Sequence, residues 1–278
     1  MTGLCAAITD AAAALAAAGI DSARTDAEQL AAHVAGIDRG RLMFVEPRPD
    51  FLDRYRILIG QRARRIPLQH LVGSAAFGPL TLSVGPGVFI PRPETEALLE
   101  WAHAVHVPAG GVIVDLCTGS GALALALAVY RPDTRVIAVE RSADALNYAR
   151  ANVDGSTVEL IRADVTERDV LADLNAKVDL VVSNPPYIPD GAQLEPEVAE
   201  HDPHMALFGG PDGMAVITPI VGLVSRLLRP GGQVGVEHDD TTSAATVELF
   251  GRAGLFTDVT ARRDLAGRHR FVTAVRAE

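Results

Sequence analysis

The residues with the clearest chemical potential form the run Asn184-Pro185-Pro186-Tyr187, which directly follows an apolar, strand-like stretch at residues 178–183. Two prolines end a strand, because proline has no ladder donor and disfavours helix in the residue before it. Asn184 and Tyr187 are therefore expected at the carboxyl edge of a sheet, where open α/β sheets bind ligands. An Asn-Pro turn is also common at strand ends without any function, so these four residues do not decide alone.

The chemistry of this run suits an amino group. The Asn184 carboxamide and the Pro185 backbone carbonyl offer two oxygen acceptors and no proton-accepting base. Such a pair can accept both hydrogens of a planar NH2 group and aim its nitrogen at an electrophile, while the Tyr187 ring covers its flat face. We predict that Asn184, Pro185 and Tyr187 act in catalysis and that these three bind the acceptor substrate together with Pro186.

A strand–turn–helix unit lies upstream of that run. The apolar stretch from Val112 is followed by Asp115, by small residues at 117–121 and then by an Ala/Leu-rich, helix-like run. Small residues let the backbone approach a ligand closely, and the amides at the start of the next helix can face it. The residues expected to bind a cofactor here are Asp115, Cys117, Thr118, Gly119, Ser120 and Gly121.

Two acidic residues follow the next two strand-like runs. Glu140 ends the run at 136–139, and an acid at the tip of the second strand can take both hydroxyls of a ribose. Asp164 follows the run at 158–161 and is expected to reach the amine of a nucleoside base together with Val165, although it can instead simply cap its turn. The three-glycine dinucleotide fingerprint is absent. The order of these features predicts a nucleoside cofactor beside an amino-group acceptor, with Asn184 contacting both.

This order resembles the S-adenosylmethionine-dependent amino-group methyltransferases. Further segments sharpen the resemblance to the bacterial release-factor glutamine methyltransferases of the HemK/PrmC type: 69–73, Phe77-Gly78, the Pro-Arg-Pro-Glu-Thr-Glu segment at 91–96, Glu195-Pro196, Ala206-Leu207, Gly209-Gly210 and Asp212-Gly213. The resemblance covers nearly the whole chain, and the segment at 91–96 is its most specific part. It implies S-adenosyl-L-methionine as cofactor and the glutamine of the release factors' Gly-Gly-Gln tip as substrate. A reducing cytoplasm is the expected location, because the two cysteines offer no disulfide framework.

One position departs from that family's pattern. Cys117 stands where the family usually has glycine, and cysteine is small and compatible with negative φ. We therefore expect the turn to survive; a requirement for positive φ would instead weaken cofactor binding.

The resemblance and the periodicity together predict an α/β fold with a doubly wound, seven-stranded, Rossmann-like methyltransferase domain and a small N-terminal helical bundle. The expected boundaries are 1–70 for a helical substrate-recognition domain, 71–90 for a hairpin linker and 91–278 for the methyltransferase domain. Five arginines decorate the helix expected near 50–65, and a solvated helix face is their favoured interpretation: Arg54, Arg56, Arg62, Arg64 and Arg65. Residues 189–214 have no periodicity and are rich in proline, glycine and acids, which is typical of a functional loop, often a lid.

Composition and charge exclude several classes. No apolar run approaches the ~18 residues of a membrane span. The two cysteines, Cys5 and Cys117, offer neither a disulfide framework nor a metal cluster, and His201, Asp202 and His204 are assigned to the loop, so no metal site is predicted. The net charge is −10, and residues 1–72 hold only eight of the 35 acidic side chains.

The remaining part of the chain is therefore strongly acidic and poorly suited to a phosphate backbone. That weighs against the main alternative, a DNA or RNA base amino-methyltransferase using the same four residues, and stable nucleic-acid binding is not expected. A second alternative is a cofactor-binding module without activity. The intact acceptors at Asn184 and Pro185 and the acid at Glu140 argue against it.

Overall fold

The computed structural model describes residues 3–44, 46 and 48–278, which divide into two compact units. The first unit comprises residues up to Ser74 together with Leu194–His201, and the second comprises Ala75–Gln193 and Asp202–Glu278. The predicted doubly wound fold with a separate helical N-terminal part is confirmed. No described helix is long and apolar enough to cross a membrane.

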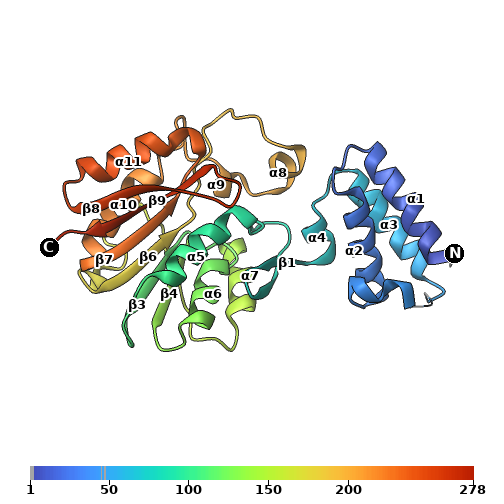
Figure 1. Cartoon of the computed structure of the whole chain (residues 1–278), viewed down its shortest axis with the longest axis horizontal. Helices are drawn as coiled ribbons and strands as arrows, with labels where there is room; N and C mark the ends of the chain where they lie inside the picture. Colours follow the sequence, from blue (N-terminus) through green and yellow to red (C-terminus); the bar gives the residue numbers. More distant parts are fainter. Residues whose placement is uncertain (1–2, 45, 47) are drawn as a thin grey trace. The chain divides into compact units, whose positions relative to one another are not determined.

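The first unit is a small bundle of helices (Figure 1). Its elements are α1 (Gly3–Ala17), α2 (Ala23–Ala35), η1 (Arg39–Phe44), α3 (Phe51–Ala63), α4 (Leu68–Val72) and, from much later in the chain, α8 (Pro196–His201). Apolar side chains from α1, α2 and α3 fill its core, including Leu15, Leu30 and Phe51. Tyr55 is buried in this core and donates its hydroxyl to the Ala27 carbonyl at 2.9 Å.

A buried ionic cluster in this unit corrects one expectation about the arginines of α3. Arg62 is only 4% exposed, and its Nε lies 2.7 Å from Asp26 Oδ2. Its Nη1 lies 2.9 Å from Glu197 Oε1, and Arg65 Nε lies 3.3 Å from the same oxygen. Arg62 is therefore not part of a solvated face. It holds α8 onto the first unit, because a guanidinium in a dry site needs carboxylate partners.

The second unit contains a seven-stranded sheet in the order β5-β4-β3-β6-β7-β9-β8. The strands are β3 (Val112–Leu116), β4 (Arg135–Glu140), β5 (Glu159–Arg162), β6 (Val178–Ser183), β7 (Leu228–Glu237), β8 (Phe256–Arg263) and β9 (His269–Arg276). The first five are parallel, whereas β9 runs antiparallel to both β7 and β8. The last two strands thus form an antiparallel pair at one edge of the sheet.

Helices cover both faces of this sheet (Figure 1). On one face, α5 (Glu96–Ala104) and α6 (Ala122–Tyr130) pack on residues such as Ile113 and Val182. On the other face, α10 (Ile217–Leu227) and α11 (Ser243–Arg252) pack on residues such as Val114 and Val181. Adjacent strand residues serve opposite layers because side chains alternate along a strand, and burial on both faces explains why β3 and β6 are almost wholly apolar.

The remaining elements of the second unit are α7 (Ala143–Val153), α9 (His204–Leu207), η2 (Pro93–Thr95), η3 (Ala172–Leu174), η4 (Asp240–Thr242) and the hairpin of β1 (Ser74–Phe77) and β2 (Leu80–Ser83). Phe77 and Leu82 of this hairpin are buried in the same core layer as α5 and α6. From Ala75 onward the predicted linker therefore packs as part of the second unit.

Candidate active site

The carboxyl ends of the parallel strands bring the predicted site residues to one edge of the sheet. Leu116 at the end of β3 pairs with Val139 of β4 on one side and with Ser183 of β6 on the other. The chain order reverses around β3, so this edge is the topological switch point where open sheets bind ligands. Asn184, directly after β6, accordingly lies near the turn at Gly119, and both line the same cavity.

The turn after β3 has an unusual backbone. Gly119 and Gly121 have φ values of 58° and 84°, and Cys117 has a φ of 61° although it carries a Cβ. The expectation of negative φ at Cys117 is therefore wrong, and this position needs the left-handed conformation that glycine adopts without strain. The tight path is held by the Thr118 backbone N–H, which donates to the Val139 carbonyl at 2.9 Å.

Asp115 lies beneath this turn and orders it. Its Oδ2 accepts from the Thr118 hydroxyl at 2.5 Å and from the Ala124 backbone N–H at 3.1 Å. Burial raises the pKa of Asp115 to about 7, against the opposing effect of these two hydrogen bonds, and the nearby Glu140 charge raises it further. Asp115 does not line the cavity. Its hydrogen bonds order the loop, and a contact of Asp115 with the cofactor stays a prediction.

Glu140 stands at the end of β4 with its carboxylate held in place. Oε2 accepts from the Gly119 backbone N–H at 3.0 Å, and Oε1 accepts from the Ser142 N–H at 2.7 Å. The carboxylate thus links the turn after β3 to the start of α7. Its side chain lines the cavity, and each oxygen keeps a further lone pair for a ligand hydroxyl.

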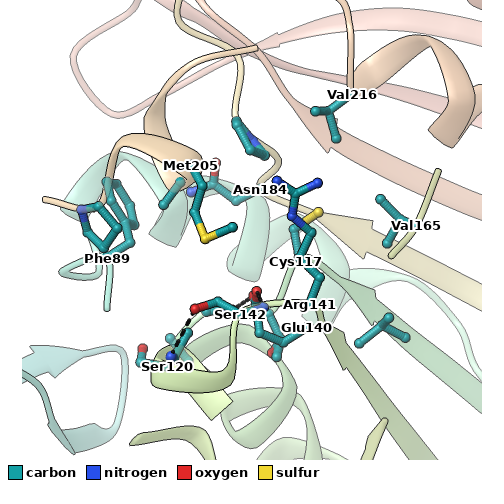
Figure 2. A pocket seen from close by; sticks show the side chains of 18 of the residues that line it. Phe89, Cys117, Ser120, Glu140, Arg141, Ser142, Val165, Asn184, Met205 and Val216 are labelled. Atoms are coloured by element: carbon teal, nitrogen blue, oxygen red, sulfur yellow. Dashed lines mark hydrogen bonds between the residues drawn. The ribbon is translucent and has the colours of Figure 1, made fainter. Parts of the chain in front are cut away.

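These strand ends surround a cavity of about 310 Å³. Cys117, Glu140 and Asn184 point into it from three different strand ends (Figure 2). The predicted residues that line it are Cys117, Thr118, Gly119, Ser120, Glu140, Asp164, Val165, Asn184 and Pro186. Phe77, Phe89, Met205 and Phe208 add apolar walls that the sequence did not reveal as site residues. A largely apolar cavity with a few polar groups is typical of a cofactor site.

Asp164 is partly committed to its own turn. Oδ1 accepts from the Thr166 backbone N–H at 2.9 Å and from the Thr166 hydroxyl at 2.7 Å, and Oδ2 lies 2.9 Å from Arg141 Nη1. Burial pushes the pKa of Asp164 upward, but these hydrogen bonds and the Arg141 charge hold it below its usual value. The carboxylate therefore stays ionised beside the cavity, and it also caps its turn, as the alternative interpretation expected.

Asn184 lies where two cavities meet. A second, smaller cavity of about 20 Å³ is lined by Asn184, Pro185, Tyr187, Phe89 and three residues at 188, 206 and 207. Asn184, Phe89 and Ala206 line both cavities. The four motif residues thus divide between them, with Pro186 on the larger cavity and Pro185 and Tyr187 on the smaller one.

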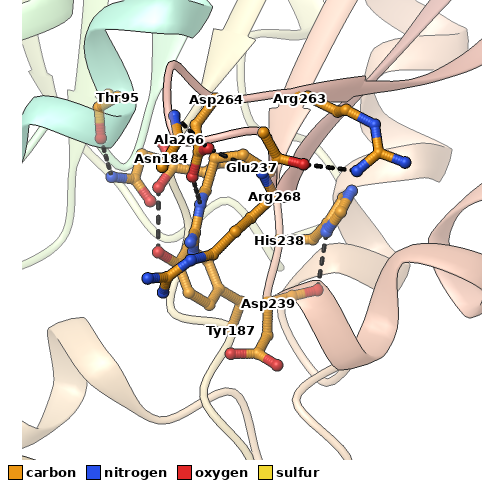
Figure 3. A network of polar contacts seen from close by, with 12 residues as sticks. Thr95, Asn184, Tyr187, Glu237, His238, Asp239, Arg263, Asp264, Ala266 and Arg268 are labelled. Carbon is orange, nitrogen blue, oxygen red and sulfur yellow. Dashed lines mark hydrogen bonds and ion pairs between the residues drawn. The ribbon is translucent and has the colours of Figure 1, made fainter.

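The orientation of the Asn184 carboxamide is set by a residue that sequence reasoning assigned no role. Asn184 Nδ2 donates to Thr95 Oγ1 at 3.1 Å (Figure 3). Thr95 ends η2, within the segment at 91–96. Because the amide nitrogen is engaged, Oδ1 is the atom left to accept, and no hydrogen bond within the described residues uses it or the Pro185 carbonyl. Both predicted acceptors are therefore available.

The loop after α9 packs directly on the backbone of the motif. Ile188 N–H donates to the Leu207 carbonyl at 2.9 Å, and Gly209 N–H donates back to the Ile188 carbonyl at 2.9 Å. A Cβ on Gly209 would lie 2.6 Å from the Pro186 carbonyl oxygen. Only glycine allows this approach, which explains the Gly209-Gly210 pair noted in the sequence.

Tyr187 directs its hydroxyl away from solvent and onto Glu237, the last residue of β7. The Tyr187 hydroxyl donates to Glu237 Oε1 at 3.0 Å (Figure 3). Burial raises the pKa of Tyr187 well above its ordinary value, and the Glu237 charge adds to the effect. Sequence reasoning missed Glu237, although an acid that ends an apolar strand is the signal that identified Glu140.

Comparison with known proteins supports this picture. The family model described as "Methyltransferase small domain" matches residues 82–201, and the one described as "PrmC N-terminal domain" matches residues 6–73. A solved methyltransferase from Pyrococcus furiosus has a TM-score of 0.55 at 17% identity, over 79% of this chain and 100% of that one, so it shares the fold. Fold and family match define an S-adenosylmethionine-dependent methyltransferase.

Curated relatives narrow the class. The chain is 68% identical to the release factor glutamine methyltransferase of Mycolicibacterium smegmatis, over 99% of each chain. It is 63% identical to that of Mycobacterium tuberculosis, over 97% of this chain and 90% of the relative, and 49% identical to that of Streptomyces coelicolor, over 95% and 94%. The chain therefore belongs to the release factor glutamine methyltransferase family, and the resemblance read from its sequence is confirmed.

Proposed function

We propose that this protein transfers a methyl group from S-adenosylmethionine to the side-chain amide nitrogen of the glutamine in the Gly-Gly-Gln motif of bacterial peptide chain release factors. The observation that carries the proposal is the position of Asn184 between two cavities, with its carboxamide nitrogen occupied by Thr95 and its oxygen free. The larger cavity suits the methyl donor, and the smaller one lies where the acceptor amide would enter.

The larger cavity fits the cofactor by its chemistry. Its volume of about 310 Å³ and its apolar walls suit a nucleoside-sized ligand. We assign the ribose hydroxyls to Glu140, whose two oxygens are pre-oriented by backbone N–H groups at 3.0 and 2.7 Å. The left-handed turn at 117–121 would approach the ligand with its backbone, and Asp164 and Val165 would hold the base. When bound, S-adenosylmethionine supplies a methyl group on a sulfonium, already activated for displacement.

The work left to the protein is alignment of the acceptor. A carboxamide nitrogen is a poor nucleophile because its lone pair is delocalised into the carbonyl. Asn184 Oδ1 and the Pro185 carbonyl would accept its two hydrogens, aim the nitrogen at the methyl carbon from about 3 Å, and stabilise positive charge as it develops. The excess proton can leave to water after transfer, so no general base is required at the motif. Pro185 and Pro186 stiffen the loop that carries both acceptors.

We further propose that the first unit recognises the body of the release factor and that the second unit takes the glutamine loop. Exposed apolar side chains support a docking role for the first unit, since Phe44 is 86% exposed and Met43 is 77% exposed. Large apolar groups in contact with water at neighbouring positions are typical of interaction sites. A cytoplasmic location follows for an enzyme that acts on translation factors.

The decisive experiment is a methyl-transfer assay with radiolabelled S-adenosylmethionine. Purified release factor is compared with a release factor whose Gly-Gly-Gln glutamine is replaced by alanine, and with single- and double-stranded DNA and RNA. We expect label in the intact release factor alone. Label in nucleic acid but not in release factor would instead support the base amino-methyltransferase alternative, and cofactor binding without any transfer would support the inactive module.

A further inference from the structure

Glu237 is a buried acid at the candidate active site to which the proposed mechanism gives no role. It ends β7 at the same sheet edge as Asn184, and the neighbouring residue Val236 pairs with Ser183, which directly precedes the motif. Glu237 is 1% exposed. Burying an ionisable group away from water costs stability unless hydrogen bonds or opposite charges compensate, so an acid at this position needs a physical reason.

Glu237 contacts Tyr187 directly and lies near Thr95, the residue that holds the Asn184 carboxamide. On one side, Oε1 accepts directly from the Tyr187 hydroxyl at 3.0 Å. On the other side stands Thr95, whose Oγ1 accepts from Asn184 Nδ2 at 3.1 Å and whose own hydrogen is therefore left to donate elsewhere. The Thr95 hydroxyl is near enough to Glu237 to lower the pKa of the carboxyl. Oε2 is buried and makes no hydrogen bond within the described residues, so a Thr95 hydroxyl that donates to it would give this atom the partner it lacks.

The charges around Glu237 leave its ionisation finely balanced. Burial raises its pKa to about 7, while the Thr95 and Tyr187 hydroxyls and the positive charge of Arg270 on β9 lower it, and the charge of Glu94 of η2 raises it. The Arg270 guanidinium also pairs with Asp264, whose Oδ2 lies 3.3 Å from Arg270 Nε. Its positive charge is therefore divided between two carboxylates and compensates the charge of Glu237 only in part. His238, next in the chain, is buried and its pKa is lowered by burial, which leaves it uncharged at neutral pH.

We propose that Glu237 is a positioning residue for the acceptor amide: as a carboxylate it orients Tyr187 directly and Asn184 through Thr95. This inference rests on the proposed function. It assigns to Glu237 the orientation of both side chains that would contact the acceptor amide. A carboxylate only accepts hydrogen bonds, so it forces both hydroxyls to donate to it. Thr95 is then left with lone pairs for the Asn184 nitrogen, which turns Asn184 Oδ1 toward the substrate. A protonated Glu237 would itself donate, and Thr95 would lose its fixed direction.

The test is Glu237→Gln, which keeps size and one acceptor oxygen but removes the charge. Its matched control is Glu248→Gln on α11, where an exposed carboxylate pairs with the exposed Arg252. For Glu237→Gln we expect the single-turnover methylation rate to fall at least about tenfold, as for other preorganised groups. The affinity for S-adenosylmethionine, measured by calorimetry, should change less than about threefold, because Glu237 does not line the larger cavity.

The pH profile distinguishes positioning from a merely structural role. The wild-type rate should rise with pH through an apparent pKa near 7, the value that burial gives this carboxyl, and Glu237→Gln should lack that step. Glu237→Asp, which keeps the charge, should retain it. If Glu237 acts through Thr95, the losses in Glu237→Gln and Thr95→Val should be clearly less than multiplicative in the double variant.

The outcomes separate the two proposals. Wild-type enzyme that puts no label into release factor would refute the proposed function itself. Active wild-type enzyme, with Glu237→Gln matching it in rate and pH profile, would overturn the positioning role and leave the function standing. If Glu237→Gln fails to fold, Glu237→Asp decides the same question: an unchanged rate without a step near pH 7 would refute the inference.

Discussion

Cys117 allows a quantitative test of backbone strain in the cofactor turn. Its φ of 61° is in the left-handed region, which costs a residue with a Cβ about 1–2 kcal/mol. Glycine would remove that strain, but it also increases the conformational entropy of the unfolded chain, which lowers the free energy of unfolding by about 0.5–1 kcal/mol. For Cys117→Gly we therefore expect a net gain of roughly 0.5–1 kcal/mol in the free energy of unfolding.

The control for this change is Cys117→Ala, which removes the thiol but keeps the Cβ and thus the strain. In thermal unfolding of the unliganded protein, Cys117→Gly should melt about 1–4 °C above Cys117→Ala, using about 2–4 °C per kcal/mol for a chain of this size. The comparison isolates the backbone, because both variants lose the thiol and its contact with Ser183.

Cofactor affinity should respond differently from stability. We expect the turn to have the same positive φ in the free and the bound state, so the strain cancels in the binding free energy and does not weaken cofactor binding as the sequence suggested. Calorimetry should therefore give the two variants the same affinity for S-adenosylmethionine. A Cys117→Gly protein that melts no higher than Cys117→Ala would refute the strain argument, and one that binds cofactor much more tightly would show that the free turn relaxes in solution.

Four further predictions follow from the site. Asn184→Ala should bind S-adenosylmethionine nearly normally in calorimetry but lose about 10²–10³ in methylation rate. Asn184→Asp should also be slow, and an Asn184→Asp enzyme as fast as wild type on release factor would refute the orientation argument. Glu140→Ala should weaken cofactor binding by roughly 1.5–3 kcal/mol, measured by calorimetry with the fold checked by circular dichroism, and unchanged affinity would mean that another acid holds the ribose. Burial raises the pKa of Asp115 to about 7, so the folded state holds its proton more tightly than the unfolded chain. The stabilisation that this proton gives below about pH 4 should be lost as the pH rises to about 7. In a pH series of chemical denaturation, Asp115→Asn should remove this change in the free energy of unfolding. Phe44→Asp should raise KM for intact release factor but not for a short Gly-Gly-Gln peptide; equal effects on both substrates would argue against docking at η1.

The parts of the fold and site that were predictable are those encoded in short, continuous stretches. β3, β4 and β6 are apolar runs that end at a glycine turn, an acid and a proline pair, and those local signals place Gly119, Glu140 and Asn184 at one edge. Thr95 and Glu237 were not predictable in the same way. Thr95 precedes Asn184 by 89 residues, and only the folded chain brings its hydroxyl within 3.1 Å of the carboxamide nitrogen.

The misjudged residues share a physical cause. Arg62 is expected in solvent because the arginines near 50–65 point around much of the helix. In the fold, two carboxylates from distant parts of the chain, Asp26 and Glu197, compensate for its burial. The backbone angle at Cys117 was misjudged because residue type alone carries a preference for φ and not its value. In both cases the tertiary context overrides a sound local preference.

The ion pairs of Arg62 have a topological consequence. Because α8 belongs to the first unit while the residues before Leu194 and after His201 belong to the second, the chain passes between the units three times rather than once. A single cut near residue 74 would therefore not yield two separable pieces. Removing the part before the cut would take Arg62 away from Glu197 and leave α8 without its ion-pair partner. The exposed α8 would then directly precede the cavity-lining stretch that begins at Pro203. The first unit is therefore built from two separate stretches of the chain, and its role is best probed by point substitution in the intact chain.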